Sequence, residues 1–82
     1  PPVVRMGITP GRRPVVRARA TDLGSIARMT VTVDGRPVRT VRRPAVGVRL
    51  PVLRSRAEVR VTAEDMAGNT GDRRRQVRSR LR

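Results

Sequence analysis

The stretch from residue 29 to residue 35 reads MTVTVDG, and it contains both the strand pattern and the turn signal that decide the fold. Its apolar side chains are spaced by two, which places them on one face of a β-strand and the threonines on the other. Asp34-Gly35 then favours a two-residue hairpin, because a type I′ turn needs positive φ at both central positions. The stretch therefore predicts a half-buried strand that returns in an antiparallel hairpin.

The same alternation recurs in three further stretches, VRARA (16–20), VGVRLPV (46–52) and AEVRVTA (57–63). With 14 Val and 7 Thr, the chain is rich in the β-branched residues that fit a pleated sheet. Strands with one apolar and one charged face are typical of antiparallel sheets in a sandwich or barrel. The predicted strands are 3–8, 14–21, 27–33, 36–42, 46–53, 57–64 and 73–81.

The alternation also predicts which side chains form the core. Pro51 lies inside a predicted strand, so we expect an edge strand or a bulge there, because proline cannot donate to a ladder. In the last strand Val77, Ser79 and Leu81 should point inward. The predicted buried set is Val16, Ala18, Met29, Val31, Val33, Val48, Leu50, Val59, Val61, Ala63 and Val77.

Length and composition restrict the classes of protein. The 82 residues suffice for one domain (1–82), and the chain begins with proline rather than Met, which predicts a piece excised from a longer protein. No Cys and no His are present, so disulfides, Cys/His zinc sites and the usual nucleophile–base pairs are excluded. The sequence thus predicts a protein that is not an enzyme, with no cofactor and no small-molecule substrate.

The sequence is strongly basic. The chain has 20 Arg, no Lys and 6 acidic residues, for a net charge of +14. Arg17, Arg19, Arg28, Arg49 and Arg60 are predicted to form a stripe on the solvent face of one sheet, which is the footprint expected of polyanion binding. The C-terminal cluster adds Arg73, Arg74, Arg75 and Arg78.

The arginines can also be interpreted without a binding function. A face of solvated charges keeps a small sandwich soluble and protects its edges from pairing. The complete absence of Lys indicates a coding bias more than selection for phosphate, because Lys also serves well as a phosphate ligand. No aromatic side chain is present to stack a base, so only non-specific contact with nucleic acid or an acidic polymer remains.

An Asp recurs after two of the predicted strands, as Asp22 and Asp65. Each follows an inward Ala by two residues, and in a seven-stranded sandwich the two loops lie at the same end. The preferred interpretation is that each carboxylate accepts hydrogen bonds from its own loop. The alternative is a calcium site, since Ca²⁺ takes six to eight oxygen ligands. Its candidate ligands are Asp22, Glu64, Asp65, Asn69 and Asp72.

The chain resembles a bacterial immunoglobulin-like domain over most of residues 14–71. The resemblance rests on RARATD (17–22), the strand from 24 to 33, VDG (33–35) and VRVTAEDMAGNT (59–70). These match the family order A-x-D, V-x-V-D-G and V-x-A-x-D-x-A-G-N, of which the last element is the most specific. The chain is also similar to fibronectin type III and cadherin-like modules.

This resemblance implies a seven-stranded antiparallel immunoglobulin-like β-sandwich. It further implies a non-catalytic spacer, adhesion or accessory module of a larger extracellular or cell-surface bacterial protein, with neighbouring domains as its partners. The chain departs from the family by lacking the core aromatic, so we expect a smaller or looser core. The alternative function is a basic module that binds acidic polymers through its Arg-rich face.

Overall fold

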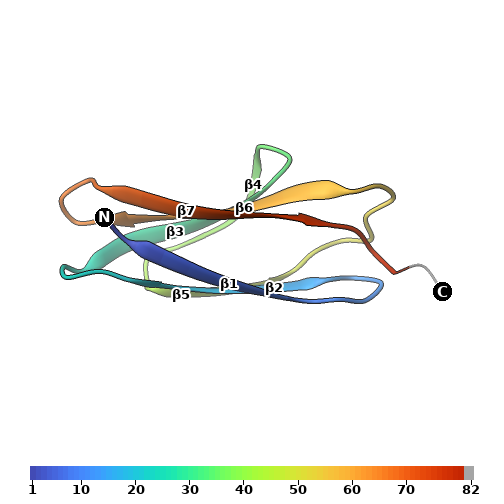
Figure 1. Cartoon of the computed structure of the whole chain (residues 1–82), viewed down its shortest axis with the longest axis horizontal. Coiled ribbons are helices and arrows are strands. Elements are labelled where there is room, and N and C mark those ends of the chain that lie inside the picture. Colours follow the sequence, from blue (N-terminus) through green and yellow to red (C-terminus); the bar gives the residue numbers. More distant parts are fainter. Residues whose placement is uncertain (81–82) are drawn as a thin grey trace.

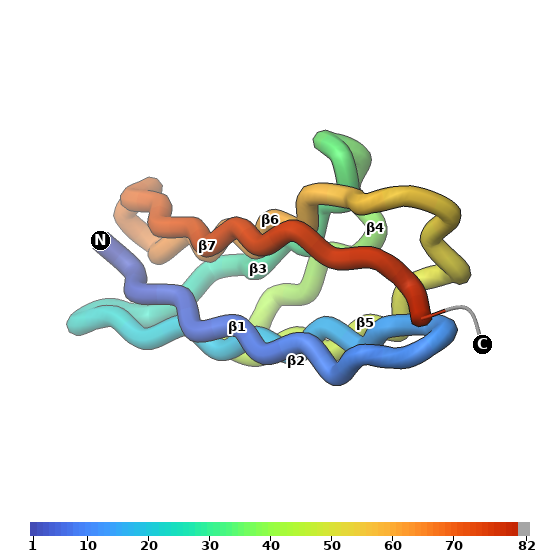
Figure 2. Tube along the Cα trace, turned by 45° about the vertical axis from the view of Figure 1, so that its right-hand side comes forward, coloured from blue at the N-terminus to red at the C-terminus, as the bar shows by residue number. Residues whose placement is uncertain are grey.

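The computed structural model describes residues 1–80, and within them it is all-β, with seven strands and no helix. The two sheets form two facing layers (Figures 1 and 2). The strands are β1 (Val3–Thr9), β2 (Val15–Thr21), β3 (Ile26–Val33), β4 (Arg36–Val41), β5 (Ala45–Arg49), β6 (Ala57–Asp65) and β7 (Thr70–Val77).

Every strand pairing is antiparallel. One sheet has the order β1-β2-β5, and the other has the order β4-β3-β6-β7. The chain therefore crosses between the sheets after β2, after β4 and after β5. The predicted hairpin joins β3 to β4, and Asp34 and Gly35 both have positive φ, at 51° and 83°. This is the backbone conformation that a type I′ turn requires.

The core lies between the sheets and is built from small and medium side chains. Met29, Leu50, Val31 and Val61 are fully buried. Of the predicted set, Val33, Val48 and Val77 are only partly buried, because each lies near the end of its strand. The predicted set omits five residues of the buried hydrophobic core, namely Val4, Ala20, Val41, Val46 and Ala57, although Ala20 was expected to face inward from its place before Asp22.

Two predicted strand boundaries were wrong. The strand predicted over 46–53 ends at Arg49, and the Leu50 N–H donates to the Pro14 carbonyl (2.7 Å) just before Pro51, which has no N–H to donate. The strand predicted over 73–81 spans 70–77. It ends there because Val77 pairs with the first residue of β6, Ala57, so the chain beyond has no partner in that ladder.

Val77, Ser79 and Leu81 were predicted to point inward, and the first two lie in the described part of the chain. Val77 is partly buried and Ser79 is buried, with the Ser79 hydroxyl accepting a hydrogen bond from the Leu53 N–H (2.6 Å). Ser79 thus ties the segment after β7 to the segment after β5. Leu81 lies outside the described residues.

Candidate functional site

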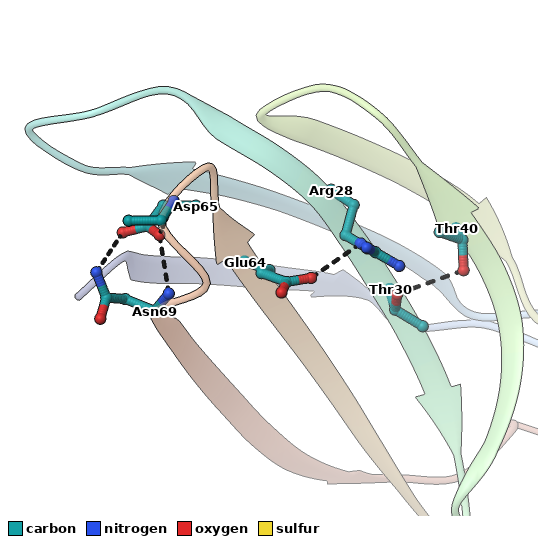
Figure 3. Close-up of polar contacts among 7 residues, drawn as sticks. Arg28, Thr30, Thr40, Glu64, Asp65 and Asn69 are labelled. Atoms are coloured by element: carbon teal, nitrogen blue, oxygen red, sulfur yellow. Dashed lines mark hydrogen bonds and ion pairs between the residues drawn. The ribbon is translucent and has the colours of Figure 1, made fainter.

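The arginines on the outer face of the four-stranded sheet are balanced by acidic side chains. Arg28 pairs with Glu64 (2.9 Å), as Figure 3 shows, and Arg60 pairs with Asp72 (2.6 Å). Arg74 lies 3.9 Å from the same Asp72 carboxylate. These pairs are exposed, so each adds little stability, but together they neutralise much of the charge on this face.

The outer face of the three-stranded sheet has no such balance. Arg5 on β1, Arg17 and Arg19 on β2 and Arg49 on β5 all lie on it, because each alternates with an inward apolar residue. None of these three strands contains an acidic residue. Among residues 1–80, no ion pair involves any of the four arginines.

The predicted single stripe of arginines was therefore wrong. Arg17, Arg19 and Arg49 lie on the three-stranded sheet, whereas Arg28 and Arg60 lie on β3 and β6 of the other sheet. The two outer faces point away from each other, so these side chains do not form one surface. Alternation predicts that a residue faces outward, but it does not predict which strands share a sheet.

A hollow of about 620 Å³ lies over the acid-free face. Its lining includes five arginines, and none of its eleven lining residues is acidic. The sequence analysis missed three of these arginines, namely Arg5, Arg39 and Arg43. The signal that could have found the hollow is the pair of strand glycines, Gly7 and Gly47, because glycine in a strand leaves a gap on the face of the sheet.

The C-terminal arginines lie along an edge strand. Arg73 and Arg75 pair with the buried Val61 and Val59, so they occupy inward register positions of β7, yet both are exposed. Inward-pointing charges on an edge strand oppose pairing with another chain. This placement agrees with the protective role expected for part of the charge. Arg78 follows the end of β7 and is also exposed.

Asp65 organises the loop between β6 and β7 (Figure 3). Its carboxylate accepts hydrogen bonds from the Asn69 side-chain amide (3.0 Å) and from the backbone N–H groups of Asn69 (2.8 Å) and Ala67 (2.9 Å). The Asn69 amide is the main cause that lowers the pKa of Asp65 from its ordinary value of 3.8, with burial opposing and the backbone donors assisting. Asp65 is therefore a turn-forming carboxylate.

The other recurring Asp lies beside this loop. The Met66 N–H donates to the Ser25 carbonyl (3.0 Å), so the two loops meet at one end of the sandwich, and the Asp22 side chain assists in lowering the pKa of Asp65. Asp22 also accepts a hydrogen bond from the Leu23 N–H (2.9 Å). Leu23 and Met66 are both exposed apolar side chains at this end.

The five candidate calcium ligands do not converge. Asp22, Asp65 and Asn69 meet at the end of the sandwich, whereas Glu64 and Asp72 point to the outer face and pair with arginines. Glu64 and Asp65 are adjacent in β6, so they face opposite sides of the sheet. No group of three acidic side chains in residues 1–80 is placed to hold a metal ion.

No helix long and apolar enough to cross a membrane occurs in residues 1–80. Comparisons with protein-family models, with curated proteins and with solved structures find no match to this chain.

Proposed function

We propose that this chain is an immunoglobulin-like, non-catalytic module that holds the neighbouring parts of a larger bacterial extracellular or surface protein at a fixed distance. The observation that carries the proposal is the position of the chain ends. The fold is 44 Å long and at most 19 Å across. β1 begins at one end of the long axis and the chain leaves β7 at the other (Figure 1). Modules with this geometry extend in line when they are joined.

The strand order supports the immunoglobulin-like part of the proposal. An immunoglobulin sandwich of the constant type has strands A, B, E and D in one sheet and C, F and G in the other, and the variable type adds C′ and C″ beside C. Taken in chain order, β1 to β7 correspond to A, B, C, C′, E, F and G, an arrangement that has the A-B-E and C′-C-F-G neighbours but no strand D among residues 1–80. The resemblance of residues 14–71 to bacterial immunoglobulin-like domains supports the extracellular setting.

A tandem of two copies of residues 1–82, joined by a two-residue linker, tests the spacer function. We expect small-angle X-ray scattering to give a maximum dimension close to twice the 44 Å length of one copy. The exposed Leu23 and Met66 would face the preceding copy, because the loop after β2 lies beside the start of β1, where Val3 pairs with Thr21, and the Met66 N–H donates to Ser25 in that loop. A tandem whose copies fold back side by side, with a maximum dimension near that of one copy, would contradict a spacer role.

A second candidate function is the binding of anionic polymers. The observation that favours it is the acid-free outer face of β1, β2 and β5. Binding to a polymer such as duplex DNA should then weaken with salt, and its logarithmic slope should fall by about 0.9 for each phosphate contact removed. Arg17→Gln and Arg49→Gln should each reduce this slope. Arg28→Gln is the control, because Arg28 is already paired with Glu64.

A further inference from the structure

We propose that the hollow on the outer face of the three-stranded sheet is a site for a phosphate group carried by a larger anion. This inference rests on the second candidate function and gives it a location and a ligand chemistry. The hollow lies over the middle of the sheet, where Gly7, Arg17 and Gly47 are paired across β1, β2 and β5.

The floor of the hollow is open because two of these three paired residues have no side chain. A Cβ built at Gly7 would meet nothing within 4 Å, and one at Gly47 would meet only ordinary contacts at 4.0 Å. Neither glycine is needed for a turn, since neither has positive φ. The two glycines therefore leave room above the sheet in which an anion can lie beside the stem of Arg17.

The walls of the hollow carry five unbalanced positive charges. Arg5 and Arg19 come from the sheet and are directly opposite each other in the β1–β2 ladder. Like charges in directly opposite positions repel each other. Arg39 on β4 and Arg43 in the connection to β5 close the side of the hollow. A bound anion relieves the repulsion among these groups, because it is attracted to all of them at once.

The chemistry of the walls selects a phosphate-like group. Each guanidinium presents planar N–H donors that match two oxygens of a phosphate at the same time. A phosphate has enough oxygens and enough charge to engage several arginines, whereas one carboxylate engages a single guanidinium in this way. No aromatic side chain exists in the chain to recognise a base, so the anionic group itself is what is recognised.

Competing arginine clusters are less suited to this ligand. Those on the outer face of the four-stranded sheet are paired with Glu64 and Asp72. Arg75 and Arg78 line a second acid-free hollow beside β7, but it is smaller, at about 430 Å³. It is lined by three arginines, the third being Arg80, against five in the first hollow. This second hollow supplies the matched control for the experiment, because removing its arginines changes the net charge equally.

The test measures binding of inorganic pyrophosphate and of long-chain polyphosphate by isothermal titration calorimetry at 0.15 M salt. We compare the parent chain with Gly47→Leu, which fills the hollow without changing the charge. Arg17→Gln/Arg39→Gln removes two charges from the hollow, and Arg75→Gln/Arg78→Gln removes two from the control hollow. Gly7→Leu replaces Gly47→Leu if thermal melts show that the latter is not folded.

We expect saturable binding to the parent and at least a tenfold loss of affinity in Gly47→Leu and in the Arg17/Arg39 variant. The Arg75/Arg78 variant should lose less than threefold. Binding of pyrophosphate with these losses identifies a diphosphate unit as sufficient, and the same losses with polyphosphate alone identify a longer chain as the ligand. Equal losses in both arginine pairs, or no effect of filling the hollow, overturn the located site. Absence of polyphosphate binding to the parent overturns the second candidate function as well.

Discussion

Gly71 of β7 lies so close to the backbone of Pro2 that a Cβ at this position would overlap the Pro2 carbonyl oxygen. Gly71 faces inward, opposite the buried Ala63, and Pro2 is itself buried just before β1. The contact joins the edge strand of one sheet to the edge strand of the other. At this point the two edges meet backbone to backbone, because Gly71 has no side chain.

The close approach at Gly71 predicts that Gly71→Ala is destabilising. The added methyl group must displace the backbone at Pro2, and overpacking of this kind costs about 1–3 kcal/mol of unfolding free energy. Urea denaturation measures the loss. Gly24→Ala is the control, since a Cβ at Gly24 meets nothing within 4 Å, and we expect a change below about 0.5 kcal/mol there. Equal effects at both glycines would show that Pro2 does not lie against β7.

Truncation of the core at Val61 should also be costly. Val61 is fully buried at the centre of β6, where it pairs with Val31. Val61→Ala removes buried methyl groups and leaves a cavity, so we expect a loss of about 2–3 kcal/mol in a urea melt. Val3→Ala is the matched control, because Val3 is 59% exposed. A loss below about 0.5 kcal/mol for Val61→Ala would contradict the register of β6.

The hairpin between β3 and β4 depends on Gly35. Its φ of 83° lies in the left-handed region, which β-branched residues resist. Gly35→Val should therefore destabilise the fold by about 1–2 kcal/mol, the cost of a left-handed conformation for an L-residue. Gly35→Asn should lose less, because Asn tolerates this conformation. Indistinguishable thermal midpoints for the Val and Asn variants would mean that the turn has another geometry.

The lowered pKa of Asp65 links stability to pH. The folded state binds the Asp65 proton more weakly than the unfolded state, so this contribution is present above the ordinary pKa of 3.8. It is lost as pH falls through the lower folded value. Asp65→Asn should be less stable than the parent at pH 7 and should lose less stability between pH 6 and pH 2. A parallel pH dependence of the two melts is the result that contradicts this linkage.

Calcium distinguishes the two interpretations of the same carboxylate. The hydrogen bonds from Asn69 and Ala67 already occupy both Asp65 oxygens, so the thermal midpoint should not change with added calcium or with EDTA. The thermal midpoint of the Asp65→Asn variant should likewise not change with added calcium or with EDTA. A midpoint that rises with calcium concentration in the parent and not in the variant would establish a metal site by mass action.

Much of the fold could be predicted from the sequence because alternation is a local property. The strand containing Val31 and the turn at Asp34-Gly35 follow from a few neighbouring residues. The grouping of strands into sheets depends on long-range pairing, which leaves no local signal. For that reason Arg17 and Arg60 were assigned to one surface although they lie on opposite faces of the molecule.

The candidate site was harder to predict than the fold. The role of Asp65 as a turn-forming carboxylate follows from its place after a strand and before Asn69. The hollow, in contrast, combines Arg5, Arg39 and Gly47 from three separate strands. Such a convergence becomes visible only when the order of the strands is known.

The position of the chain ends has a mechanical consequence. A force that pulls the two ends apart acts along β1 and β7, which run in the same direction along the length of the fold (Figure 2). It would slide β1 past β2 and β7 past β6 rather than peel either strand away from its end. Seven residue pairs of the β1–β2 ladder and eight of the β6–β7 ladder then share the load simultaneously. Rupture requires many hydrogen bonds to break in one step, so the fold should unfold slowly under tension along this axis.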